Sequence, residues 1–187
     1  MSNYFYNAVV AKDECEQLIS EYKDSDFTTA QVSGNPKIEN DKLQSNVRET
    51  DIIWIKPEKL INRSFYSFVS EANNKVFHFD LSGHQQIQFS KYTKDGYYEW
   101  HRDSLNVNPK EGASIRKLSA TIQLSDPSTY EGGEFQFYDG VQPEIIPDIK
   151  EQGSIIIFES ADWHRITPIT QGVRYSLVMW AIGPNFR

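Results

Sequence analysis

The chain has 187 residues, of which 39% are hydrophobic and 13% aromatic, so it can bury the core of one domain of ordinary size. Its formal net charge of −7 argues against a broad surface that binds nucleic acid by counterion release. Cys15 is the only cysteine, which excludes an intrachain disulfide and favours a reducing compartment. No basic stretch leads into an apolar run at the start, and no segment approaches ~20 apolar residues. We therefore expect a cytoplasmic protein that binds neither nucleic acid nor a membrane.

The first third of the chain is expected to be mainly helical. An apolar stripe at helical spacing over residues 11–22, with acidic residues near its start, predicts a first helix. Residues 24–51 are polar and have no sustained period, which predicts a long surface loop that is either a lid over a substrate or disordered. Pro57 opens a second helical pattern that runs to Ala72 with its apolar residues on one face. We expect this second helix to pack against a sheet.

Strands dominate the rest of the chain. Apolar and aromatic runs of strand length alternate with turn signals such as "KDG", "NPKEG", "YEGG" and "EQG". The best strand candidates are residues 84–92, 117–125, 133–139, 154–160 and 174–183. A helical part over about residues 1–80, followed by strands over about residues 84–184, predicts a single domain of the α+β class that is mainly β. The strands are expected to close into a sandwich or barrel such as a jelly roll.

Residues 97–104, "YYEWHRDS", place a histidine and a carboxylate two positions apart. In a strand, His101 and Asp103 would project from one face while Arg102 points away, so three residues can present one nitrogen and one oxygen ligand. Such a pair alone is usually structural, and a metal needs a third ligand. His164 follows a very apolar predicted strand, at the mouth of the expected β core. Two histidines and one carboxylate would make the facial triad of non-haem Fe(II) oxygenases, although zinc accepts the same ligand types.

Arg174 opens the last apolar strand and shares a face with Ser176, Val178 and Trp180 by strand parity. A guanidinium that faces inward needs an anion, because a buried unpaired charge is very costly. Its fork matches a carboxylate with two hydrogen bonds. On its own, Arg174 would be interpreted as a strand-end arginine in solvent or in a salt bridge. Together with the three candidate ligands, it indicates a site that binds a carboxylate beside a metal.

These residues and their spacing resemble the iron(II)- and 2-oxoglutarate-dependent dioxygenases, and within them the prolyl 4-hydroxylase-like branch. The resemblance runs from about Gln85 to Pro184 and is carried by "KYTKDGYYEWHRD", "RKLSATIQLSDPSTYEGGEFQFYDG" and "GSIIIFESADWHRITPITQGVRYSLVMWA". The small bacterial or phage hydroxylases of the PKHD type are similar through "LSDPSTYEGGEF". The resemblance implies a double-stranded β-helix (jelly roll) with the N-terminal helices packed on one sheet.

Carried over position by position, the resemblance implies that His101, Asp103 and His164 bind Fe(II). It also implies that Arg174 binds the distal carboxylate of 2-oxoglutarate and that Tyr92 hydrogen-bonds the same carboxylate. The cosubstrates implied are 2-oxoglutarate and O2, with ascorbate as a reductant. The reaction implied is hydroxylation of an aliphatic C–H bond, with decarboxylation of 2-oxoglutarate to succinate and CO2.

Three further positions are implied to belong to the site. Gln123 stands where many family members have a tyrosine that contacts the cosubstrate, while Tyr98 and Trp180 match residues of the substrate pocket. The substrate implied is a prolyl residue in a protein or peptide. One alternative is a hydroxylase of a free amino acid or small metabolite on the same scaffold, which a deep closed pocket would favour. The other is a non-catalytic jelly-roll binding module that contains a metal.

Overall fold

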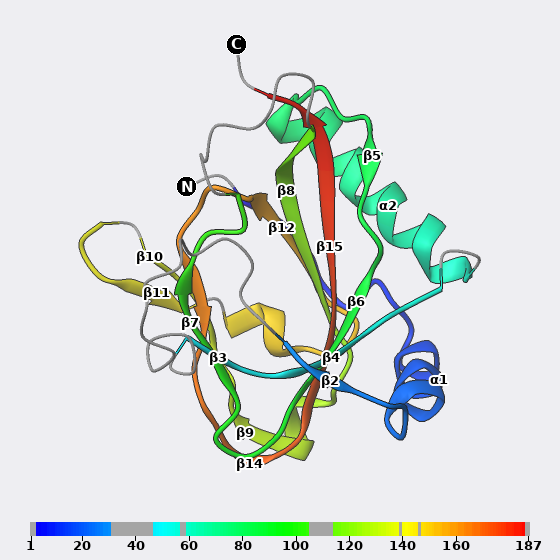
Figure 1. Ribbon diagram of the computed structural model, residues 1–187, viewed down its shortest axis with the longest axis vertical. Coiled ribbons are helices and arrows are strands. Elements are labelled where there is room, and N and C mark those ends of the chain that lie inside the picture. The colour runs from blue at the N-terminus through cyan, green and yellow to red at the C-terminus, as the bar shows by residue number, and fades with distance from the viewer. Residues whose placement is uncertain are drawn as a thin grey trace.

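The computed structural model describes residues 3–30, 47–56, 59–104, 114–138, 140–145 and 147–185. Within these residues, two sheets face each other, and the helices α1 (Lys12–Tyr22) and α2 (Leu60–Ala72) cover the outer face of the larger sheet (Figure 1). This arrangement is a double-stranded β-helix, and it confirms the predicted fold class. None of the described helices is long and apolar enough to cross a membrane.

The major sheet is antiparallel, and neighbouring strands come from distant parts of the sequence. Its order is β1 (Asn3–Tyr6), β12 (Ile155–Glu159), β8 (Ser114–Gln123), β15 (Arg174–Pro184), β6 (Gln88–Tyr92), β4 (Asp51–Trp54) and β2 (Thr28–Thr29), and β5 (Gly83–His84) also pairs with β15. The predicted strands of this sheet are therefore confirmed. The N-terminal part is not purely helical, because it adds strands to both edges of the sheet.

The minor sheet is also antiparallel and carries the candidate histidines. Its order is β11 (Pro143–Ile145), β10 (Phe135–Tyr138), β13 (His164–Ile166), β7 (Tyr97–His101) and β3 (Arg48–Glu49). A separate two-stranded sheet pairs β14 (Ile169–Gly172) with β9 (Tyr130–Gly132). Single helical turns complete the described chain at η1 (Asn73–Phe77), η2 (Pro127–Thr129) and η3 (Pro147–Lys150).

The helices pack on the major sheet through the apolar stripes that the sequence predicts. In α2, Ile61, Phe65, Val69 and Ala72 are all 5% exposed or less, and they join Phe89 of β6 in one core cluster. Each large apolar side chain buried in this way contributes about 1.5 to 3 kcal/mol. The predicted start of this helix, Pro57, lies outside the described residues.

A second core fills the space between the two sheets. Strand β12 serves both cores, because Ile155 and Ile157 face the helices while Ile156 and Phe158 face the minor sheet. A strand that is buried on both faces needs apolar residues at successive positions, which explains the continuous run "IIIF". This second core supports the back of the pocket.

The predicted surface loop over residues 24–51 is only partly described. Its described ends form β2, β3 and the start of β4, so the segment contributes edge strands to both sheets. Residues 31–46, which the prediction of a lid or a disordered loop concerns most, lie outside the described residues.

Candidate active site

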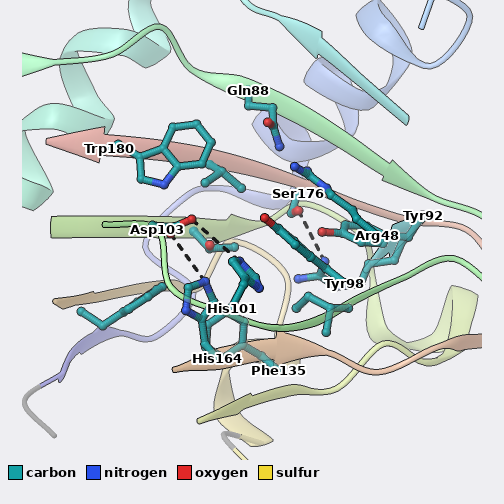
Figure 2. Close-up of a pocket in the computed structure, with 15 residues that line it drawn as sticks. Arg48, Gln88, Tyr92, Tyr98, His101, Asp103, Phe135, His164, Ser176 and Trp180 are labelled. Carbon is teal, nitrogen blue, oxygen red and sulfur yellow. Dashed lines mark hydrogen bonds and ion pairs between the residues drawn. The ribbon is translucent and has the colours of Figure 1, made fainter. Parts of the chain in front are cut away.

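A pocket lies between the two sheets, and all three candidate metal ligands line it (Figure 2). His101 is the last residue of β7, and His164 is the first residue of β13, directly opposite it in the ladder. The ligand atoms of these histidines and of Asp103 all lie within 4.8 Å of one another. Asp103 Oδ1 is 3.8 Å from His101 Nε2, and Asp103 Oδ2 is 3.5 Å from His164 Nε2.

The local backbone differs from the strand parity that the sequence analysis used. Strand β7 ends at His101, so Asp103 lies in the bend that follows the strand and not within it. The pairing of β7 with β13 also contains a bulge, since the step from His164 to Ile166 lies opposite the step from His101 to Tyr98. The extra residue in β7 turns both Tyr98 and His101 toward the pocket, although they are three positions apart.

Both histidines are oriented by backbone carbonyls. Nδ1 of His101 lies 2.7 Å from the carbonyl oxygen of Glu99, and Nδ1 of His164 lies 3.0 Å from that of Asp162. Because a carbonyl oxygen only accepts, each Nδ1 carries a hydrogen, and Nε2 is the nitrogen that each ring can offer to a metal. Burial, followed by the neighbouring His164, lowers the pKa of His101 to about 3, so its imidazole is neutral. This is the form in which histidine binds metals.

Asp103 is held as a carboxylate by its surroundings. Burial alone would raise its pKa, but His164, His101, a hydrogen bond from Ser119 and the guanidinium of Arg116 together lower the pKa to about 2. Ser119 Oγ donates to Asp103 Oδ2 at 2.6 Å, and Arg116 Nη1 lies 3.9 Å from Oδ1. One carboxylate oxygen and two imidazole nitrogens suit an Fe(II) ion with coordination positions left open.

Arg174 lies in the same pocket and is 2% exposed. It is the first residue of β15 and stands opposite Tyr92 of β6, whose ring centroid is 5.4 Å from the guanidinium carbon. Its Nη1 donates to Ser176 Oγ at 3.4 Å, and among the described residues it forms no ion pair with a carboxylate. A buried guanidinium without an anion is a site for an anionic ligand.

A glycine makes room for the Arg174 side chain. Gly133 has φ +60°, and a Cβ at this position would lie 3.0 Å from Cδ of Arg174 and 2.5 Å from Cδ1 of Ile169. Neighbouring Gly132 has φ +78°, and a Cβ there would meet the carbonyl oxygen of Pro168 at 2.2 Å. Both glycines of "EGGEF" therefore serve backbone geometry and close packing.

The remaining predicted site residues divide into two groups. Tyr98 and Trp180 line the pocket, and the Tyr98 ring stacks on the His101 ring with a centroid separation of 3.4 Å. Gln123 is fully buried but does not line the pocket. Its Nε2 donates to the carbonyl of Ser125 and to the hydroxyl of Tyr130, at 3.0 and 3.1 Å. The structure therefore does not bring Gln123 together with the other site residues.

Several residues that line the pocket are not among the site residues predicted from the sequence. Gln88 and Thr121 line the pocket, and strand parity with Tyr92 and Gln123 could have placed them on the inner face. Arg48 also lines the pocket, although the sequence predicts a surface loop for its segment. The hydrophobic pattern carries no signal for Arg48, because β3 has only two residues and is held by pairing with the distant β7.

The sequence of the chain is similar to those of known oxygenases. The sequence model described as "2OG-Fe(II) oxygenase superfamily" matches residues 87–182. A PKHD-type hydroxylase of Shewanella sp. (strain MR-4) is 27% identical over 175 residues, which cover 92% of this chain and 74% of the relative. The PKHD-type hydroxylase YbiX of Escherichia coli O6:K15:H31 (strain 536 / UPEC) is 35% identical over 95 residues, which cover 49% of this chain and only 40% of YbiX.

Solved structures share the fold over nearly the whole chain. The viral collagen prolyl hydroxylase of Paramecium Bursaria Chlorella virus-1, in its 2OG complex, has a TM-score of 0.73 at 18% identity and covers 98% of this chain and 97% of its own. A prolyl hydroxylase of Trichoplax adhaerens, in complex with a peptide fragment of the hypoxia inducible factor, has a TM-score of 0.71 at 17% identity. That match covers 96% of this chain and 82% of the other.

Proposed function

Because the chain belongs to the 2OG-Fe(II) oxygenase superfamily, we propose that it hydroxylates an aliphatic C–H bond of a prolyl residue in a protein or peptide. Membership makes the chain a 2-oxoglutarate-dependent dioxygenase, an oxidoreductase that uses Fe(II), 2-oxoglutarate and O2. The choice of a prolyl substrate is supported by the names of three of its structural neighbours, which are prolyl hydroxylases, one of them in complex with a peptide.

The proposed metal ligands are His101, Asp103 and His164. Fe(II), when bound, supplies the redox chemistry by which O2 and 2-oxoglutarate oxidise a C–H bond, with release of succinate and CO2. The two imidazoles offer Nε2 because their Nδ1 atoms are engaged by backbone carbonyls. Asp103 offers a carboxylate that Ser119 holds in place by a hydrogen bond. These contacts restrict the side chains before a metal arrives, which lowers the cost of ordering them.

Arg174 and Tyr92 are the proposed anchor for the distal carboxylate of 2-oxoglutarate. The guanidinium supplies the positive charge and the fork of donors, and the adjacent phenol can add a third hydrogen bond. Phe135 and Phe158 line the pocket and are buried, so water is kept away from the bound cosubstrate. A dry site strengthens the charge pair between Arg174 and the carboxylate.

The observation that carries this proposal is that one pocket contains both a set of three metal-ligand side chains and a buried arginine without an anionic partner. A generic metal-binding jelly roll would need the first feature but not the second. The combination suits a metal and a dicarboxylate that bind side by side.

The test is turnover of 2-oxoglutarate and a panel of proline-containing peptides and free amino acids, scored by mass spectrometry for the gain of one oxygen atom. We expect a peptide product that depends on Fe(II) and 2-oxoglutarate and that disappears in His101→Ala. The matched control is His78→Ala, since His78 is exposed and does not line the pocket. Oxygen gain only on a free amino acid would support the metabolite alternative. Absence of succinate formation would support a binding module and contradict the proposal.

A further inference from the structure

Arg48 is a second arginine of the pocket and has no role in the proposed chemistry. It lies in β3, opposite Tyr98 of β7, and its guanidinium carbon stands 4.4 Å from the centroid of the Tyr98 ring. Its Nε is buried and has no hydrogen-bond partner. In the view of Figure 2, Arg48 and Tyr92 occupy one end of the pocket, the three candidate ligands occupy the other, and Tyr98 lies between them. A charged fork with at least one unused donor therefore stands inside the pocket.

The pocket holds more positive than negative protein charge, although the whole chain is acidic. Among the described residues that line it, Arg48 and Arg174 are the arginines and Asp103 is the only carboxylate. The oxygens of Asp103 are already engaged by Ser119, by Arg116 and by the two histidines. No carboxylate of the described lining is left to neutralise Arg48.

Arg48 is half-buried, and the face of Tyr98 offsets only part of the cost of removing its charge from water. Stacking on an aromatic ring is worth about 0.5 to 2 kcal/mol, and it satisfies none of the N–H groups at the edge of the guanidinium. Trp180 shows the same deficit, because its Nε1 is buried in the pocket wall without an acceptor. Two unused donors, one of them charged, indicate a ligand that is rich in acceptors and negatively charged.

The cosubstrate alone does not account for this demand. If 2-oxoglutarate places its distal carboxylate on Arg174 and its other end at the metal, both of its negative charges are used. Arg48 lies in the minor sheet, whereas Arg174 lies in the major sheet. The Tyr98 ring contacts both the Arg48 guanidinium and the ring of His101, a candidate metal ligand. Arg48 is thus placed beside the position where a substrate must approach the metal.

From these contacts we propose that the substrate carries a carboxylate that binds Arg48, so that Arg48 makes the enzyme selective for acidic substrates. The inference rests on the proposed function and deepens it. The carboxylate can come from a free amino acid or from an aspartate or glutamate beside the hydroxylated residue. In both cases the recognised chemistry is one carboxylate on one guanidinium fork.

The experiment measures binding of matched probes to the full chain, loaded anaerobically with Fe(II) and saturating 2-oxoglutarate, by isothermal titration calorimetry. One arm compares L-proline with L-prolinamide. The other arm uses blocked peptides with one proline and one aspartate, placed before or after it, each compared with its asparagine counterpart. We expect the carboxylate member of at least one arm to bind about tenfold tighter, because Arg48 is half-buried and a partly solvated charge pair is weaker than a fully buried one. The arm that shows the preference identifies the source of the carboxylate.

Two substitutions link the preference to Arg48. Arg48→Gln removes the charge and the guanidinium fork but keeps a polar amide on a shorter side chain, so it should abolish the preference. Arg48→Lys should retain part of it. The matched control is Arg63→Ala, because Arg63 is exposed on α2 and should leave the preference unchanged. The affinity for 2-oxoglutarate, measured on the same samples, should change less than twofold in Arg48→Gln, because the proposed anchor of 2-oxoglutarate is Arg174 and not Arg48.

Failure of the inference can be separated from failure of the proposed function. If the wild-type protein binds and consumes 2-oxoglutarate but shows no carboxylate preference in either arm, or binds no probe, the role of Arg48 is rejected. It is also rejected if the preference survives Arg48→Gln, or if that variant loses 2-oxoglutarate affinity instead. If the wild-type protein does not bind 2-oxoglutarate at all, the proposed function itself is rejected.

Discussion

Replacing Arg174 by alanine tests the cosubstrate site most directly. Arg174 is 2% exposed, so its pairing with a carboxylate takes place in a desolvated environment where charge interactions are strong. Removing one partner of a buried charge pair costs about 2 to 5 kcal/mol. At about 1.4 kcal/mol per factor of ten, the dissociation constant for 2-oxoglutarate should rise by about 30-fold to several thousandfold. The metal site should be little affected, because Arg174 contacts none of the three candidate ligands.

The assay is anaerobic titration of 2-oxoglutarate into protein loaded with Fe(II), with the metal affinity measured separately on each variant. Arg174→Lys keeps the charge without the fork and should fall between wild type and Arg174→Ala. Arg63→Ala removes an exposed arginine and should bind 2-oxoglutarate as the wild type does. An unchanged affinity in Arg174→Ala would refute the assignment of the anchor. Equal losses of metal and 2-oxoglutarate binding would instead indicate a misfolded pocket.

Four further outcomes follow from the described contacts. Ser119→Ala removes the hydrogen bond to Asp103 and should weaken metal affinity about 10- to 100-fold, measured by competition with a chelator. Gly133→Ala would crowd the stem of Arg174 and strain a positive φ, so 2-oxoglutarate should bind more weakly while the metal affinity stays near wild type. Burial, aided by nearby acids, raises the pKa of Cys15 to about 12, so a disulfide reagent at pH 8 should label it only after denaturation; labelling of the native protein would contradict this. Phe65→Ala should lower the free energy of unfolding by about 3 to 5 kcal/mol in urea titrations, because Phe65 is fully buried on the face of α2 that packs in the core.

The parts of the fold that the sequence predicts are those in which one segment carries its own pattern. Helix α2 buries its residues at helical spacing, and β15 alternates so that Arg174, Ser176, Val178 and Trp180 all face the pocket. In these elements the periodicity of the buried positions is a property of the local backbone. The same reasoning predicted that His101 lies in a strand and that His164 follows an apolar strand at the mouth of the core, and the structure pairs the two residues in one ladder.

The parts that the sequence could not predict depend on pairing between distant segments. Arg48 reaches the pocket because β3 adds to the edge of β7, and no pattern within a two-residue strand announces that pairing. The inward position of Tyr98 depends on a bulge that appears only when β7 is aligned with β13. Gln123 lies two positions after Thr121, which lines the pocket, but the amide of Gln123 is bonded to Tyr130 and to the carbonyl of Ser125 instead of lining it. The direction of the Gln123 side chain depends on which hydrogen-bond partners lie near it in space, and the sequence alone does not show those partners.

The two sheets contribute different parts of the proposed site, and the core between them relates the parts in space. The minor sheet supplies His101 and His164 as register partners, so the ladder itself limits the separation of their imidazoles. The major sheet supplies Arg174, whose position is set by its pairing with Tyr92. Phe158 of the major sheet packs edge-on against the His164 ring, with centroids 4.7 Å apart, and so joins the two halves. A dicarboxylate that spans from the metal to the guanidinium is selected by length only if that separation is constant. We therefore expect the packed aromatic core to restrict the length of the 2-oxo acid that can span from the proposed metal site to Arg174.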